Sequence, residues 1–200
     1  MSATRVAIID NGGANIASLR YALERLGVDS TLTAIPGELA AATHVILPGV
    51  GAARDAMRRL EQSGLADAIR NLDRPVLGIC LGMQLLFEAS AEGETRCLGV
   101  LPGRLERLQP APDHPVPHMG WNRIEPVQPS RLLEGITDDD YFYFVHSYAA
   151  PVNDSTCATA EYRVPFASVV ARGPYFGTQF HPERSARPGA RLLENFLRIG

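Results

Sequence analysis

The sequence predicts one α/β domain, residues 1–200, with a mixed, mainly parallel sheet and helices on both faces. Two observations favour this fold class. In the first half, short apolar runs alternate with segments of helical periodicity, which is typical of βα units. In the second half, short apolar runs are separated by Pro and Gly, and the chain ends with one more strand and helix. No repeat, low-complexity tract or linker divides the 200 residues, and this length suits one compact domain.

In the first half, the elements follow from apolar runs and the turn residues between them. Gly27 ends the first helix, and Pro48-Gly49-Val50-Gly51 breaks the third strand. In chain order, we expect strands at 6–9, 30–33, 44–47 and 76–79, and helices at 16–26, from the Gly51 turn to about 72, and at 81 to about 89.

The second half predicts a series of short strands that need not all be parallel. We expect them at 104–108, 116–125, 141–148, 158–164, 166–171 and 176–180. A closing helix at 190–199 carries Leu193, Phe196 and Leu197 on its apolar side.

Composition and charge exclude several classes of function. The chain has 22 acidic and 19 basic residues, a net charge of -3, and no long Lys/Arg block, so we expect no nucleic-acid partner. The apolar run near the N-terminus is too short for a signal peptide or membrane anchor, so we expect a cytoplasmic protein without membrane contact. Cys80, Cys97 and Cys157 are odd in number and lack a CxxC or Cys/His pattern, which predicts neither disulfides nor zinc. No metal and no cofactor are expected.

Gly78-Ile79-Cys80-Leu81-Gly82 is the most informative short segment, because it lies where a strand turns into a helix. Flanking glycines relieve the crowding of such a turn, which would lift Cys80 clear of the sheet as a nucleophile. A helix N-terminus and a nearby imidazolium would both favour its thiolate. The alternative is a buried structural cysteine in a tight turn, which is our expectation for Cys97 and Cys157.

Two backbone groups are candidate donors to the oxyanion that forms when a thiolate attacks a carbonyl. Leu81 N–H lies at the start of the helix after Cys80, and the Val50 peptide is flanked by Gly49 and Gly51, which let it reorient. Such donors typically contribute about 10²–10³ in rate each.

His181 and Glu183 are the candidate base and orienting acid. They stand two apart in extended chain, and Pro182 keeps His181 out of helical geometry, so Glu183 can fix the imidazole. Cys, His and Glu then form a triad. The alternative is a surface hydrogen bond between the two side chains. His146 competes as base, but it lies in an aromatic strand where a satisfied, half-buried histidine is the ordinary expectation.

Gln84 follows Cys80 by one helical turn. Its side chain can therefore hydrogen-bond a substrate held at the thiol. The alternative is an ordinary polar helix residue.

Together these motifs resemble the class I glutamine amidotransferases. Nearly the whole chain is similar in order to one family among them, the glutaminase subunits of imidazole glycerol phosphate synthase. The matching stretches are 47–52, 78–87, 117–122, 143–148 and 177–183, of which Pro117-His118-Met119-Gly120-Trp121-Asn122 is the most specific to this family.

The resemblance implies a mechanism and a binding site. Cys80 would form a glutamyl thioester, His181 would protonate departing ammonia and then activate water, and Glu183 would orient His181. The residues implied to hold glutamine are Gln84, Glu92, His146, Ser147 and Tyr148.

The resemblance also implies a partner, a (β/α)₈-barrel cyclase subunit in a heterodimer. This partner would combine the ammonia with a phosphoribulosyl-formimino aminoimidazole carboxamide nucleotide in histidine biosynthesis. Asn15, Trp121 and Asn122 are the interface candidates, against the alternative of a buried turn tryptophan and a turn asparagine. The family usually has Asp-Tyr-Gly-Met-Gly-Asn after the first strand, whereas this chain has Asp10-Asn11-Gly12-Gly13-Ala14-Asn15 near the expected interface.

Two rival functions share these motifs. One is a hydrolase that uses the same triad alone on a peptide or γ-glutamyl substrate. The other is a non-catalytic binding subunit that keeps the fold.

Overall fold

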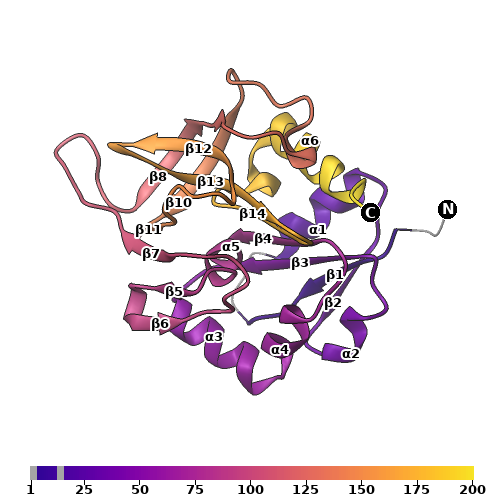
Figure 1. The fold of residues 1–200 in the computed structure, drawn as a ribbon. Helices are drawn as coiled ribbons and strands as arrows, with labels where there is room; N and C mark the ends of the chain where they lie inside the picture. The colour runs from indigo at the N-terminus through magenta and orange to yellow at the C-terminus, as the bar shows by residue number, and fades with distance from the viewer. Residues whose placement is uncertain (1–3, 13–15) are drawn as a thin grey trace.

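The computed structural model describes residues 4–12 and 16–200 and is built around an eight-stranded sheet (Figure 1). Its strands run in the order β2 (Ser30–Thr33), β1 (Val6–Ile9), β3 (His44–Gly49), β4 (Val76–Cys80), β14 (Tyr175–Thr178), β13 (Val164–Arg172), β12 (Thr156–Tyr162) and β9 (Glu125–Pro126). Pairing is parallel from β2 to β14 and antiparallel from β14 to β9. The sheet is therefore mixed, and its parallel part joins four strands from the N-terminal half of the chain to β14 from near the C-terminus.

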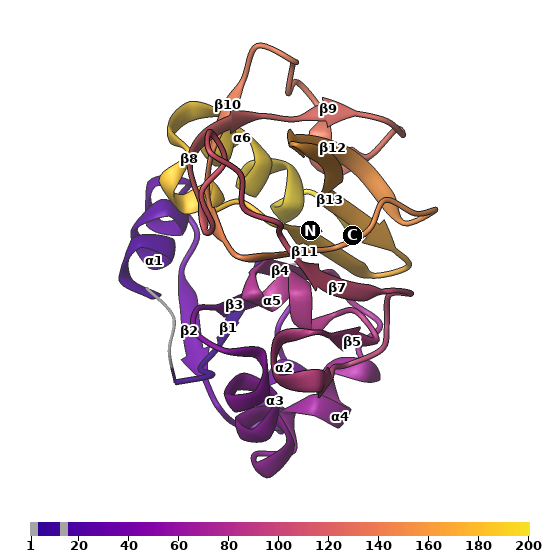
Figure 2. The same cartoon turned by 90° about the vertical axis from the view of Figure 1, so that its left-hand side faces the viewer.

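Helices cover both faces of this sheet, as Figures 1 and 2 show from two sides. On one face lie α1 (Ile16–Arg25) and α6 (Ala186–Leu197), and on the other lie α2 (Pro36–Leu39), α3 (Ala53–Gln62), α4 (Leu65–Arg70) and α5 (Leu81–Leu85). Among the described residues there are also three short 3₁₀ helices, η1 (Glu92–Glu94), η2 (Arg131–Leu133) and η3 (Pro182–Arg184). The predicted fold class is confirmed.

Two small sheets stand beside the main one, and the sequence did not distinguish them from it. The first pairs β8 (His118–Arg123) with β10 (Tyr141–His146) in antiparallel register. The second has the order β11 (Tyr148–Ala149), β7 (Arg104–Arg107), β5 (Ala89–Ser90) and β6 (Thr95–Arg96). The predicted strand at 141–148 is thus divided, because β10 and β11 pair with different partners.

Three predicted helices have different bounds. Gly64 in the left-handed region divides the predicted helix after Gly51 into α3 and α4. The helix after Cys80 ends at Leu85 because the carbonyls of Leu86 and Phe87 accept hydrogen bonds from residues 99–101 instead. The closing helix begins at Ala186, four residues early, since Pro188 falls in the first turn, where a missing N–H costs nothing.

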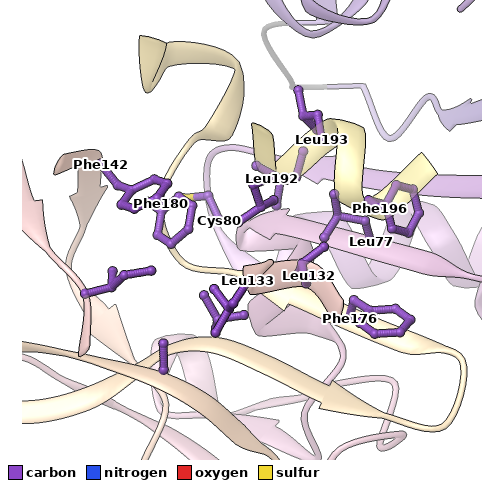
Figure 3. Close-up of a cluster of buried hydrophobic side chains, with 14 of the residues drawn as sticks. Leu77, Cys80, Leu132, Leu133, Phe142, Phe176, Phe180, Leu192, Leu193 and Phe196 are labelled. Atoms are coloured by element: carbon purple, nitrogen blue, oxygen red, sulfur yellow. The ribbon is translucent and has the colours of Figure 1, made fainter. Parts of the chain in front are cut away.

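The core has two parts, one on each face of the sheet. In β3 and β4, Ile46, Leu77 and Ile79 face α1 and α6, whereas Val45 and Val76 face α3 and α4. Figure 3 shows members of the first cluster, contributed by β4, β10, β14, η2 and α6. Strands buried on both faces read as continuous apolar runs, as β1, β3 and β4 do.

Glycines let α5 lie directly against the ends of β3 and β4. A Cβ on Gly82 would overlap the Leu47 carbonyl oxygen, and a Cβ on Gly78 would stand 2.6 Å from the Met83 nitrogen. Neither neighbour can withdraw, because both are backbone atoms. This contact fixes where the turn at Cys80 occurs.

We therefore expect Gly82→Ala to destabilise the fold by about 3 kcal/mol or more, because the added methyl must displace backbone. Gly37→Ala is the matched control, since nothing lies within 4 Å of its Cβ position, and it should stay within about 1 kcal/mol of the unaltered chain. Urea unfolding followed by circular dichroism measures both. Equal midpoints for the two variants would contradict the packing described.

Candidate active site

Cys80 occupies the expected turn between β4 and α5. Its backbone has φ 53° and ψ -111°, with a positive φ that non-glycine residues rarely adopt. Such strain costs on the order of 1–3 kcal/mol and is typical of functional positions. Cys80 is 7% exposed, and its sulfur lies 3.7 Å from the Val145 carbonyl oxygen and accepts from Gln179 Nε2 at 3.8 Å.

His181 and Glu183 form a buried pair where β14 leads into η3. His181 Nδ1 donates to Glu183 Oε1 at 2.8 Å, and the two side chains are 8% and 6% exposed. The alternative of a surface hydrogen bond is therefore wrong. Ser185, fully buried, steadies the same turn: its hydroxyl donates to the His181 carbonyl at 2.6 Å and accepts from Tyr143 N–H at 2.9 Å.

Opposing influences set the charge on His181. Burial lowers the pKa of His181, but the nearby Cys80 sulfur and the hydrogen-bonded Glu183 carboxylate outweigh it and raise this pKa to about 10. Even so, His181 Nε2 and Glu183 Oε2 are buried without a hydrogen-bond partner among the described residues. Cys80 thus raises the pKa of His181, while Nε2 makes no hydrogen bond within the described ranges.

A cavity of about 330 Å³ brings most of the predicted site residues together. Its volume suits a small molecule. The residues that line it include Val50, Cys80, Leu81, Gln84, Glu92, His146, Ser147, Tyr148 and His181. Val50 also lines a second, much smaller cavity, together with Gly49, His181 and Glu183.

Several of these side chains are already engaged with the protein. Gln84 Nε2 donates to the Tyr148 carbonyl and to Gln179 Oε1, both at 3.0 Å. Glu92 Oε2 accepts the Ala53 N–H at the start of α3 at 2.8 Å. Gln84 is thus not an ordinary exposed helix residue, and Glu92 is held at the rim of the cavity by a fixed backbone donor.

His146 has both ring nitrogens occupied. Nδ1 bonds the Tyr148 carbonyl at 2.8 Å, and Nε2 bonds His118 Nδ1 at 3.0 Å. Burial lowers the pKa of His146 to about 3, so its ring is neutral near pH 7. A neutral ring without a free nitrogen cannot serve as the base, which agrees with the expectation of a satisfied histidine. His146 is, however, buried rather than half-buried.

Two residues of the site were missed in the sequence, Gln179 and Ser185. Gln179 could have been found, because it stands two before His181 in extended chain and residues i and i+2 share a side. Ser185 gave no such signal, since its role depends on the tertiary approach of Tyr143.

The predicted interface residues lie in different settings. Trp121 is 54% exposed on β8, with its ring edge-on to Tyr143, so the alternative of a buried turn tryptophan is wrong. Asn122 belongs to the same strand rather than to a turn, and its Nδ2 donates to the Glu161 carbonyl at 2.9 Å. Asn15 falls outside the described residues, as do Gly13 and Ala14.

Neither a metal site nor a membrane span emerges from the described ranges 4–12 and 16–200. No group of three His, Cys, Asp or Glu side chains there could hold a metal ion. No helix within these ranges is both long and apolar enough to cross a membrane. The three cysteines are free and buried, and burial raises the pKa of Cys97 to about 11.

Comparison with known proteins gives the class that this fold and site define. The model of the family described as glutamine amidotransferase class-I matches residues 7–199. Two solved structures from Thermotoga maritima share the fold. One is PurLQS (TM-score 0.73, 18% identity, 98% of each chain), and the other is a glutamine amidotransferase (TM-score 0.66, 19% identity, 98% of this chain and 83% of that one).

Closer similarity is found among curated sequences. The imidazole glycerol phosphate synthase subunit HisH of Xylella fastidiosa (strain Temecula1) is 53% identical over 196 residues, and that of Xanthomonas axonopodis pv. citri is 54% identical. Each alignment covers 98% of both chains. The chain therefore belongs to the class-I glutamine amidotransferases and, within them, to the family of HisH subunits. The predicted resemblance is confirmed.

Glu183→Gln should lower the pKa of His181 from about 10 toward 6.5, because the amide keeps a hydrogen bond but removes the charge. Since folding raises this pKa, the stability that His181 contributes is complete below about pH 6.5 and lost as pH rises through about 10. NMR titration of the histidine rings measures the shift. Glu194→Gln, which changes a partly exposed carboxylate on α6, is the control, and an unchanged His181 titration in Glu183→Gln would contradict the pairing.

Proposed function

We propose that Cys80, His181 and Glu183 are the catalytic triad with which this chain hydrolyses glutamine to glutamate and ammonia. The observation that carries the proposal is that Cys80 and His181 line one cavity, with Glu183 bonded to the other ring nitrogen of His181. A strained cysteine, a histidine with a raised pKa and an orienting carboxylate are together what thioester chemistry needs.

Glutamine binding follows from the charges at the cavity. Glu92 supplies a negative charge for the α-ammonium group, and the hydrogen bond from the Ala53 N–H fixes where that charge lies. Gln84 and the 146–148 segment form the wall next to Cys80. We place the side-chain amide of glutamine at the sulfur and its amino-acid end toward Glu92.

The first half of the reaction forms the thioester. The Cys80 sulfur attacks the amide carbon, and the carbonyl oxygen becomes an oxyanion. Leu81 N–H, which follows the sulfur at the start of α5, is one donor for it, and the peptide at Val50, with Gly49 before it, is the second. His181 gives its proton to the departing nitrogen, so the carbon–nitrogen bond breaks and ammonia leaves.

The second half restores the enzyme. A water molecule attacks the thioester carbon while His181 takes one of its protons. The carbon–sulfur bond breaks, glutamate is released and the sulfur and imidazolium return to their starting state. Glu183 keeps Nδ1 of His181 as the donor throughout, which leaves Nε2 for the reacting atoms.

We further propose a (β/α)₈-barrel cyclase partner, because the relatives at 53–54% identity are named as subunits of imidazole glycerol phosphate synthase. The surface that supports this is the outer face of β8, where Met119 and Trp121 are 66% and 54% exposed. Next to it, Arg184 lies 4.8 Å over the Tyr143 ring, directly after the triad. An aromatic and arginine cluster of this kind is typical of interface hot spots. The ammonia would leave toward this face for use in histidine biosynthesis.

The free cysteines also support a cytoplasmic setting. Cys80 must stay reduced to act as nucleophile, and reducing compartments keep thiols in that state.

Cys80→Ala should reduce glutamine hydrolysis by about 10³-fold or more, because no other described group in the cavity is a nucleophile of this kind. Cys157→Ala, which removes a buried thiol elsewhere, is the control. Glutamate release is measured in the presence of the cyclase partner and its nucleotide ligand. A non-catalytic binding protein would show no loss in Cys80→Ala, and a hydrolase that works alone would show full activity without the partner.

Trp121→Ala should weaken binding of the cyclase partner by about 30-fold or more, since exposed aromatic anchors carry much of the energy of such interfaces. Val127→Ala, which removes an exposed apolar side chain just after β9, should leave the affinity unchanged. Isothermal titration calorimetry with the purified cyclase measures the affinity of both variants. Equal affinity of both variants would exclude this face as the docking surface.

A further inference from the structure

We infer that Gln179 is a positioning residue that donates an N–H to the Cys80 sulfur, and that a buried hydrogen-bond chain fixes the direction of that donation. The inference rests on the proposed function only in taking Cys80 as the nucleophile. Gln179 is fully buried, between β14 and His181, and its Nε2 lies 3.8 Å from Sγ. Unlike His181, an amide cannot take the proton, so its contribution is to hold the sulfur.

The direction follows from a backbone carbonyl. The Tyr148 carbonyl oxygen can only accept, so the Gln84 atom 3.0 Å from it must be the NH₂ group. The same NH₂ lies 3.0 Å from the Gln179 amide, which must therefore turn its oxygen toward Gln84. This leaves the Gln179 NH₂ for the sulfur. The orientation of both amides is thus set by partners rather than chosen between equivalent alternatives.

A second branch ends on the same carbonyl. His146 Nδ1, 2.8 Å from the Tyr148 oxygen, must carry a proton to bond an acceptor. Because burial lowers the pKa of His146 to about 3, its Nε2 is unprotonated near pH 7 and accepts from His118 Nδ1 at 3.0 Å. The Tyr148 oxygen then accepts two hydrogen bonds, from His146 and Gln84.

Burial makes reversal of this chain expensive. Gln84, Gln179, His118 and His146 are all 5% exposed or less. Turning the Gln179 amide would put its NH₂ against the NH₂ of Gln84 and its oxygen against the sulfur. One donor would then face another donor, and one acceptor would face another acceptor, both away from water. Each group left without a hydrogen bond carries a desolvation cost.

The charges around Cys80 show why the direction matters. His181, from the turn after β14, presents a cation, with Glu183 of η3 behind it. Glu92 of η1 lines the same cavity, and His146 at the end of β10 is neutral near pH 7. On the Gln179 side, the amide supplies a donor dipole to the sulfur without adding a charge that would compete with the imidazolium.

The test compares Gln179→Glu and Gln179→Met by the pH dependence of Cys80 alkylation with iodoacetamide, located by peptide mass spectrometry in the full chain. Gln62→Glu makes the same chemical change at an exposed end of α3 and is the control. In Gln179→Met, the pH of half-maximal alkylation should rise by about one unit, as expected for a lost hydrogen bond to an anion. In Gln179→Glu it should rise further, because a carboxylate faces the sulfur. The control should not shift.

The inference is overturned if neither Gln179 variant shifts the alkylation profile. A residue that only supported the fold would lower stability, seen in thermal unfolding, without moving this profile. Should either variant fail to fold, NMR of the Gln179 side-chain NH₂ in the unaltered chain decides: its signals should move as the sulfur titrates, and unmoved signals refute the contact. Alkylation needs no glutamine, so failure here is separate from loss of glutaminase activity in Cys80→Ala, which tests the proposed function.

Discussion

The close contact between α5 and the ends of β3 and β4 is the constraint on which the site depends. With Gly82 against the Leu47 carbonyl and Gly78 against the Met83 nitrogen, the chain has no room to turn gradually from β4 into α5. The turn must be made at one residue, and Cys80 makes it at φ 53°. Burial of β4 on both faces holds this strained backbone in place. The packing of the core thereby fixes the position of the Cys80 sulfur.

Parallel pairing of three neighbouring strands accounts for the rest of the geometry. Because β3, β4 and β14 run in the same direction, their carboxyl ends meet at one edge of the sheet. Val50 follows β3, Cys80 ends β4 and His181 comes shortly after β14, so residues more than 100 positions apart in sequence meet around one cavity. The Tyr143 carbonyl of β10 accepts the His181 N–H at 2.9 Å and thereby joins the small β8–β10 sheet to the same edge.

The sequence was sufficient where chemistry and local pattern coincide. Cys80 between glycines and His181 two residues before Glu183 were predicted from short segments, because the strand and turn geometry they require is local. What was missed depends on tertiary approach. Gln179 is informative only once Gln84 and Cys80 are known to lie beside it, and Ser185 only once β10 is placed. The helix after Cys80 was predicted too long because the carbonyls that follow it bond the loop at 99–101.

In the proposed cycle, the proton affinity of His181 can change at the step where this is needed. While the Cys80 sulfur and Glu183 both act on it, the pKa of His181 is about 10, so the imidazole holds its proton until the sulfur attacks. The sulfur loses its charge when it bonds the amide carbon, and its share of this raising influence is then gone, which favours proton transfer to the departing nitrogen. Burial, which lowers the pKa, is then opposed by Glu183 alone. The same imidazole thereby becomes better suited to return as the base that activates water, without any change in position.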